Sequence, residues 1–152
     1  MFQFDSIQAV LEFAISKEVA AQKLYSHLAE TLTDPLVKKL FTDMAAEEVD
    51  HRQQLELELM KLGHVVSTNG HSKGPRVSEC VLPDEVPLKM GYAEALVLAM
   101  QKEKAAFRLY VEMVAAAADL ECREVFLTLA EEEVRHMLRF ETAYHILMAK
   151  ET

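Results

Sequence analysis

The sequence predicts an all-α fold, a bundle of four long helices in up-down-down-up order. Three observations predict it: apolar residues recur with helical spacing in four stretches, alternating β-type runs are nearly absent, and the second half of the chain repeats the first. The repeat relates residues 5–62 to residues 90–147 at a constant offset of 85 positions. Self-similarity at a fixed period indicates a duplicated structural unit. We therefore expect residues 1–152 to form a single domain built from two helical hairpins.

Two helices and a tight turn are expected in the first half of the chain. The first helix, at about residues 5–30, has apolar side chains three or four positions apart, and Asp5 or Ser6 can cap its start. The second, at about residues 35–62, follows an Asp-Pro pair, which supplies a cap and suits the first helical position. The link at 31–34 is so short that the two helices must be antiparallel neighbours.

The connection at residues 63–87 determines how the second hairpin is placed. It contains three of the four prolines and three of the four glycines, so it is a loop rather than a helix. Its 25 residues can extend roughly 80 Å at about 3.3 Å each, whereas a helix of about 28 residues is only about 42 Å long. This crossover can therefore start the third helix, at about 88–117, from the opposite end of the bundle. The fourth helix, at about 119–150, then returns beside the third.

Composition excludes several classes of function. Half of the 152 residues are apolar, which is enough for a proper core without disulfides. Cys80 and Cys122 are the only cysteines, and no Cys-x-x-Cys motif exists to build a thiolate metal site. The net charge of −9 opposes binding to nucleic acid. Neither an export signal nor a run of about 18 apolar residues is present, so we expect a cytoplasmic protein that does not bind membranes.

The repeat carries six side chains that can bind metals. In each predicted hairpin, a lone glutamate and a Glu-x-x-His motif lie equally far from the turn and therefore at the same height. The spacing of three places Glu and His on one face of their helix. Two divalent cations would neutralise four buried carboxylates, which are otherwise costly. We therefore predict that two metal ions are bound by Glu18, Glu48, His51, Glu103, Glu133 and His136.

The type of ligand narrows the choice of metal. Carboxylates with two imidazoles suit iron, with manganese as the alternative, better than they suit zinc. Two lone glutamates and two Glu-x-x-His motifs on four helices are typical of di-iron and di-manganese carboxylate bundles. One Glu-x-x-His pair alone would be weak support, because such pairs arise by chance on helix surfaces. Their equivalent places in the repeat favour the metal site over a surface coincidence.

These motifs resemble the rubrerythrin and bacterioferritin branch of the ferritin-like superfamily, and the resemblance covers nearly the whole chain. It implies a ferritin-like four-helix bundle holding two iron ions. The carboxylates of Glu48 and Glu133 would bridge the ions. The remaining ligands would each bind one ion: Glu18 and Glu103 as terminal carboxylates, and His51 and His136 as imidazoles. The motifs that carry the resemblance are Lys17-Glu18-x6-Tyr25 and Ala45-x-Glu47-Glu48-Val49-x-His51, repeated as Lys102-Glu103-x6-Tyr110 and Ala130-x-Glu132-Glu133-Val134-x-His136.

Four further residues are candidates for supporting the ligands. Tyr25 and Tyr110, two turns beyond the lone glutamates, would donate hydrogen bonds to the ligands, or would be ordinary core residues. Glu47 and Glu132 precede the histidines by four positions and would orient them, or would form a solvated pair on the helix surface.

The resemblance implies an oxidoreductase, most simply a peroxidase-like enzyme that reduces hydrogen peroxide or O₂. Rubrerythrins have a further glutamate three residues after the ligand of the third helix, where this chain has Ala106. The cysteines of a rubredoxin domain are absent, so we expect an external, rubredoxin-like electron-donor protein. We expect the protein to contain no haem and to form a homodimer. The alternatives are a ferroxidase or iron-storage protein, a non-catalytic bundle stabilised by metal, and an oxygenase.

Overall fold

The computed structural model describes residues 6–63, 90–117 and 120–151. They form four α-helices: α1 (Ile7–Thr31), α2 (Pro35–Lys61), α3 (Tyr92–Ala116) and α4 (Leu120–Glu151). No strand occurs in this part of the chain. The predicted all-α class is therefore confirmed. None of the described helices is long and apolar enough to cross a membrane.

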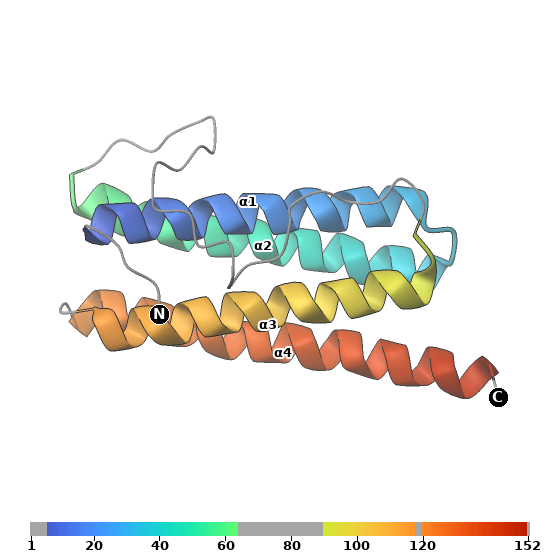
Figure 1. The fold of residues 1–152 in the computed structure, drawn as a ribbon. Coiled ribbons are helices and arrows are strands. Elements are labelled where there is room, and N and C mark those ends of the chain that lie inside the picture. Colours follow the sequence, from blue (N-terminus) through green and yellow to red (C-terminus); the bar gives the residue numbers. More distant parts are fainter. Residues whose placement is uncertain (1–5, 64–89, 118–119, 152) are drawn as a thin grey trace.

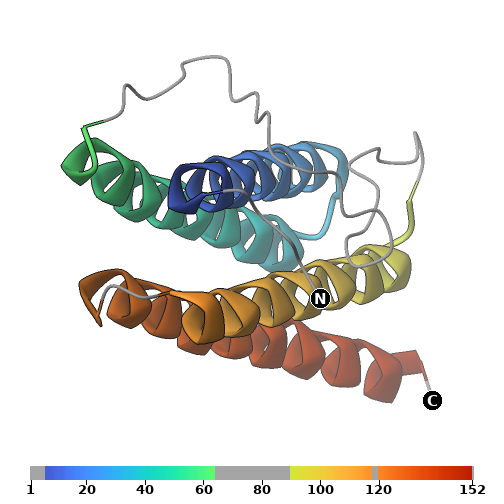
Figure 2. The ribbon, with the colours of Figure 1, turned by 60° about the vertical axis from the view of Figure 1, so that its left-hand side comes forward.

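The order of the helices is the predicted one. Figure 1 shows α2 returning beside α1, α3 running in the same direction as α2, and α4 returning beside α3. Figure 2 shows the two hairpins stacked as two layers. Between the layers, α1 contacts α3 and α2 contacts α4. The bundle is therefore up-down-down-up, as a crossover between opposite ends requires. The predicted connection at 63–87 lies outside the described residues except for Gly63, whose φ of 84° ends α2.

Capping residues fix the starts of α1 and α2 close to the predicted places, but α3 begins later than predicted. The Ser6 hydroxyl accepts a hydrogen bond from the Ala9 amide, and the Asp34 carboxylate accepts one from the Leu36 amide. The residue before α3 is Gly91, which has no side chain with which to cap the helix. Helical spacing predicted a start near residue 88. Residues 85–91 contain no Ser, Thr, Asp or Asn, so no local capping signal marks this boundary.

The core consists of two apolar clusters at opposite ends of the bundle. One is built around residues such as Leu11, Leu55 and Phe126. The other is built around Phe41 and Phe140, whose ring centroids are 5.5 Å apart. In every helix the predicted metal ligands lie in sequence between residues of the two clusters. The four helices therefore bring the ligands to one layer, closed by apolar packing at both ends.

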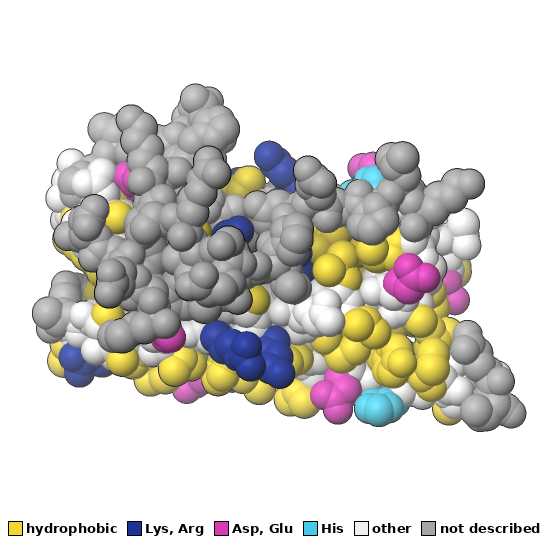
Figure 3. Space-filling model, viewed as in Figure 1, with side chains coloured by type: hydrophobic (Ala, Val, Ile, Leu, Met, Phe, Trp, Pro, Cys, Tyr) yellow, Lys and Arg dark blue, Asp and Glu magenta, His cyan; other side chains and the backbone are white. Residues whose placement is uncertain are grey.

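Some apolar side chains remain on the surface. Leu36 of α2 is 74% exposed. It lies with Leu138 and Ile146 around a groove at the end of the bundle where α2 begins. Figure 3 shows apolar side chains on the surface toward the C-terminal end of α4. Leu36 occupies the first turn of α2 and lines this groove rather than the core.

Candidate metal centre

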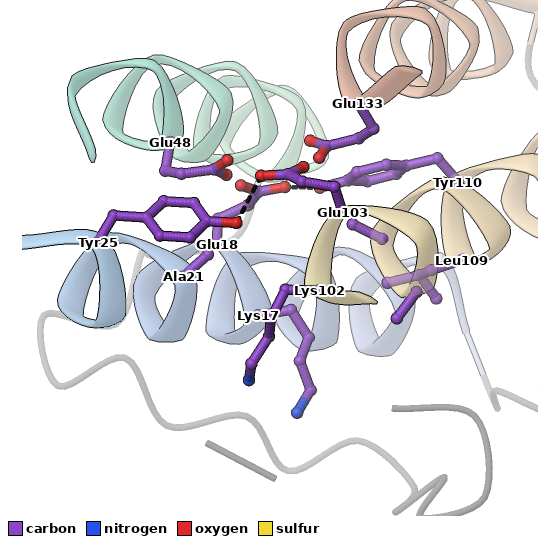
Figure 4. Close-up of a pocket in the computed structure, with 12 residues that line it drawn as sticks. Lys17, Glu18, Ala21, Tyr25, Glu48, Lys102, Glu103, Leu109, Tyr110 and Glu133 are labelled. Atoms are coloured by element: carbon purple, nitrogen blue, oxygen red, sulfur yellow. Dashed lines mark hydrogen bonds between the residues drawn. The ribbon is translucent and has the colours of Figure 1, made fainter. Parts of the chain in front are cut away.

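The structure brings all six predicted ligands together in the middle of the bundle. None of the six is more than 3% exposed, although each is a glutamate or a histidine. Glu18 comes from α1 and Glu103 from α3, while each Glu-x-x-His motif comes from α2 or α4. Figure 4 shows the four carboxylates converging from four helices. Buried groups of this kind are rare unless they are paired or bind a metal.

Each histidine directs one nitrogen at the carboxylates. Nδ1 of His51 lies 3.0 Å from Glu133, 3.5 Å from Glu18 and 3.6 Å from Glu48. Nδ1 of His136 lies 3.4 Å from Glu48, 3.5 Å from Glu103 and 3.9 Å from Glu133. The two imidazole rings stack with their centroids 5.2 Å apart. The contacts therefore follow the twofold pattern of the sequence repeat.

The ligand atoms form two overlapping groups. One contains Glu18, Glu48, His51 and Glu133, and the other contains Glu48, Glu103, Glu133 and His136. Within each group the four candidate atoms lie within 4.8 Å of one another. Glu48 and Glu133 belong to both groups. The predicted roles divide the residues in the same way, with Glu48 and Glu133 shared by two ions and each remaining ligand on one ion.

The two tyrosines contact the ligands across the bundle. The Tyr25 hydroxyl of α1 donates a hydrogen bond to Glu103 of α3 at 2.7 Å, and the Tyr110 hydroxyl of α3 donates one to Glu18 of α1. Burial, followed by the charge of the glutamate that it contacts, raises the pKa of each tyrosine well above its ordinary value. Each hydroxyl therefore keeps its proton and fixes one oxygen of Glu103 or Glu18.

The outer nitrogens of the histidines also pair across the bundle. Nε2 of His51 on α2 lies 2.6 Å from Glu132 on α4, and Nε2 of His136 on α4 lies 3.2 Å from Glu47 on α2. Glu47 is in turn 2.9 Å from Arg139. When the imidazole is neutral, as it must be to bind a metal, a carboxylate at Nε2 favours the tautomer that carries its proton there, which leaves the Nδ1 lone pair for the metal.

Protonation reduces the negative charge of the cluster when no metal is bound. Burial raises the pKa of Glu48 well above its ordinary value, and the charges of Glu18 and Glu103 raise it further. Burial also raises the pKa of Glu18, but contacts with Glu48, His51 and Tyr110 outweigh this effect and lower it overall. Burial lowers the pKa of His51, but neighbouring glutamates, with Glu18 foremost, raise it to about 9. The metal-free cluster therefore holds protons where cations would bind.

The donor atoms fit a pair of metal ions. At least one carboxylate oxygen of each glutamate, and Nδ1 of each histidine, is buried without a hydrogen-bond partner among the described residues. Buried polar atoms normally have partners, so an unpaired group of this size needs an explanation. Two divalent cations would satisfy these atoms and neutralise the four carboxylates together. Oxygen and imidazole donors suit iron or manganese.

The pairing across the bundle gives a specific prediction for Glu132. Glu132→Gln is expected to weaken metal binding about 10- to 100-fold, because its amide no longer fixes His51 as a carboxylate does. Metal affinity measured by competition with a chelator tests this. The matched control is Glu131→Gln, which changes an exposed neighbour on the same helix and is expected to leave affinity unchanged. Equal affinity in both variants would show that Glu132 does not position the ligand.

A comparison of this chain with protein-family models identifies its family. A family model described as Rubrerythrin matches residues 9–144. This chain belongs to the rubrerythrin family. The resemblance inferred from the motifs is thereby confirmed. Rubrerythrin-family proteins are ferritin-like di-iron carboxylate proteins and are generally redox-active. A comparison with curated proteins finds no significant match.

Solved structures share the fold of this rubrerythrin-family chain. A hypothetical protein from Pyrococcus furiosus is similar at a TM-score of 0.76 and 22% identity, covering 97% of this chain and 94% of that one. A dodecameric thioferritin, the bacterioferritin-related protein of Bacteroides fragilis, has a TM-score of 0.77 and 19% identity, covering 95% and 86%. A ferritin-like, diiron-carboxylate protein from Bacillus anthracis has a TM-score of 0.65 and 22% identity, covering 91% and 94%. At these identities the likeness shows the fold alone.

Sequence reasoning located the six candidate ligands, but it missed parts of their surroundings. It placed Glu47 and Glu132 near the histidines of their own helices, whereas each lies against the histidine of the opposite hairpin. It did not single out Arg139, which pairs with Glu47. The available signal was a break in the repeat, because the position equivalent to Arg139 in the first half is Gln54.

Proposed function

We propose that this protein is a di-iron oxidoreductase that reduces hydrogen peroxide, with O₂ as the alternative oxidant. The observation that carries the proposal is the buried cluster of four glutamates and two histidines in a rubrerythrin-family chain. Reduction of one H₂O₂ to two waters consumes two electrons and two protons. We propose that a separate, rubredoxin-like protein supplies the electrons.

The residues around the cluster support this chemistry. Two irons bound there would supply two electrons together to one oxidant. Glu48 and Glu133 belong to both groups of candidate ligands and would be shared by the two ions, and Tyr25 and Tyr110 donate hydrogen bonds to Glu103 and Glu18. The apolar clusters on both sides exclude bulk water, which strengthens electrostatic interactions within the layer.

Protons can reach the centre through side chains that touch both the ligands and the surface. The side chain of Glu47 is 41% exposed and that of Glu132 is 29% exposed, yet each lies against the outer nitrogen of a buried histidine. Glu47 is also held by Arg139, which is 44% exposed. These two carboxylates connect the buried imidazoles with solvent on the surface formed by α2 and α4.

Ferroxidase or iron-storage activity is the second candidate. Two observations favour it: the net charge of −9, which attracts cations, and the structural similarity to a protein described as a dodecameric thioferritin. Accumulation of many irons per chain in a large assembly would support this candidate. A bundle in which metal serves only the fold is the third candidate, and it predicts a reduced centre that reacts with neither oxidant.

Stopped-flow mixing of the reduced, iron-loaded protein with each oxidant tests the proposal. We expect hydrogen peroxide to oxidise the centre much faster than O₂ does, by about tenfold or more at equal concentrations, which corresponds to about 1.4 kcal/mol in activation free energy. The reaction is monitored by the absorbance of the oxidised centre. Protein with Glu133→Gln, loaded in the same way, serves as the control for free iron. If O₂ oxidises the centre as fast as hydrogen peroxide does, or faster, the peroxidase hypothesis is refuted.

A further inference from the structure

A small cavity lies against the carboxylate cluster between α1 and α3. Its volume is about 40 Å³, and all four candidate glutamate ligands and both tyrosines line it. The histidines do not line it, because they reach the cluster from α2 and α4. The carboxylate layer therefore has two sides. One faces the imidazoles, and the other faces the cavity.

Three alanines form part of the wall of the cavity. Ala21 of α1 and Ala106 of α3, which occupy equivalent positions in the repeat, both line it, and Ala105 lies beside Ala106. On the side away from the carboxylates the lining includes Lys17 and Lys102, whose ammonium ends point outward in Figure 4. The cavity therefore extends from the buried cluster toward half-buried residues of α1 and α3.

Buried oxygen atoms at this cavity lack partners. Oε2 of Glu18 and Oε2 of Glu103 have no hydrogen-bond partner among the described residues, and both side chains are at most 3% exposed. A cavity needs roughly 10–15 Å³ of such free volume to hold one water, so this cavity of about 40 Å³ has room for about three waters, or for a molecule of two or three heavy atoms, but not for an aromatic ring.

We infer that small ligands reach the metal pair through the cavity between α1 and α3, and that Ala21 and Ala106 set the largest ligand that can bind. This inference rests on the proposed function, since it requires the six side chains to hold metal. It restricts the substrate to hydrogen peroxide, O₂ or molecules of similar size. Organic hydroperoxides with aromatic or branched alkyl groups are excluded because a larger group would overlap the two alanine side chains.

The test uses protein loaded with Co²⁺, which does not depend on redox activity. Azide binding is followed by the visible absorption of the cobalt. Ala21→Val and Ala106→Val are expected to weaken azide binding by about tenfold or more, since one or two methylenes have effects of this size in a filled site. Ala20→Val is the matched control, because Ala20 is a half-buried neighbour on α1 that does not line the cavity. All variants should bind as much cobalt as the original protein.

The original protein provides a second test that needs no substitution. Formate and benzoate have the same carboxylate group but differ by an aromatic ring. Formate is expected to compete with azide, and benzoate is not. Azide binding that is equal in all four proteins, or competition by benzoate, would overturn the inference, as would failure of the original protein to bind cobalt.

The outcomes separate this inference from the proposed function. If azide distinguishes the alanine variants while the iron-loaded protein does not reduce peroxide, the cavity is a ligand site and the proposed reaction is wrong. If peroxide is reduced equally fast by the original protein and by both alanine variants, the reaction stands and the route through the cavity is wrong. Cumene hydroperoxide should oxidise the iron-loaded protein far more slowly than hydrogen peroxide.

Discussion

Glu48→Gln is expected to abolish binding of the metal pair and to stabilise the metal-free protein. Glu48 belongs to both groups of candidate ligands, so both ions lose a shared carboxylate. Burial and the charges of Glu18 and Glu103 raise its pKa. When folding raises the pKa of a glutamate, the protein loses stability as the pH rises above the pKa that this glutamate has in the unfolded chain. At pH 7 Glu48 therefore opposes folding. Neutral glutamine removes this effect, and we expect a gain of about 1–3 kcal/mol.

Two measurements check this prediction. Elemental analysis after anaerobic loading with ferrous iron should give about two irons per chain for the original protein and nearly none for the variant, in line with the paired-ion pattern. Urea denaturation of the metal-free proteins gives the change in stability. Glu58→Gln is the matched control, because Glu58 is a buried glutamate on the same helix that pairs with Lys61, outside the cluster.

The control should keep its metal and lose a little stability, because it breaks an ion pair. If Glu48→Gln loses its metal but gains stability, the carboxylate cluster serves metal binding and destabilises the metal-free fold. Retention of two irons by Glu48→Gln would refute its assignment as a shared ligand. If Glu48→Gln loses as much stability as the control, burial and charge repulsion at Glu48 do not destabilise the metal-free protein.

The fold was predictable because three independent signals agree. Helical spacing locates the four helices, the Asp34-Pro35 pair and Gly63 mark ends of α2, and the length of the connection fixes the order of the hairpins. The height of the ligand layer followed from geometry, since Glu18 and Glu48 are equally far from their turn. These properties depend on local sequence or on chain length, and one sequence is sufficient to infer them.

The contacts around the ligands could not be predicted in the same way. Whether Glu132 meets His136 on its own helix or His51 on α2 depends on how closely two hairpins approach and on the rotation of each helix. Neither quantity is encoded in the spacing of residues along one helix. The cavity at Ala106 was likewise out of reach, because its volume depends on side chains from all four helices. The sequence therefore identified the candidate ligands better than their surroundings.

Metal loading is expected to raise the stability of the bundle strongly. Binding to the folded state alone adds about 4 kcal/mol per site when free metal is a thousand times its dissociation constant. For a domain of this size, each kcal/mol raises the melting temperature by about 2–4 °C, so two sites should raise it by roughly 15–30 °C. The physical reason is that the metal-free layer buries four carboxylates with unpaired oxygens, and cations remove that cost.

Calorimetry with and without Mn²⁺, Fe²⁺ or Co²⁺ under anaerobic conditions measures this effect, and the affinities should increase in that order. Glu48→Gln provides the control, because its melting temperature should not respond to metal. Unchanged melting of the original protein would mean that the six residues do not bind ions. A large increase supports binding but does not identify the reaction, since a purely structural site would respond equally. The rates with peroxide and O₂ decide between those two roles, because only a redox centre reacts with either.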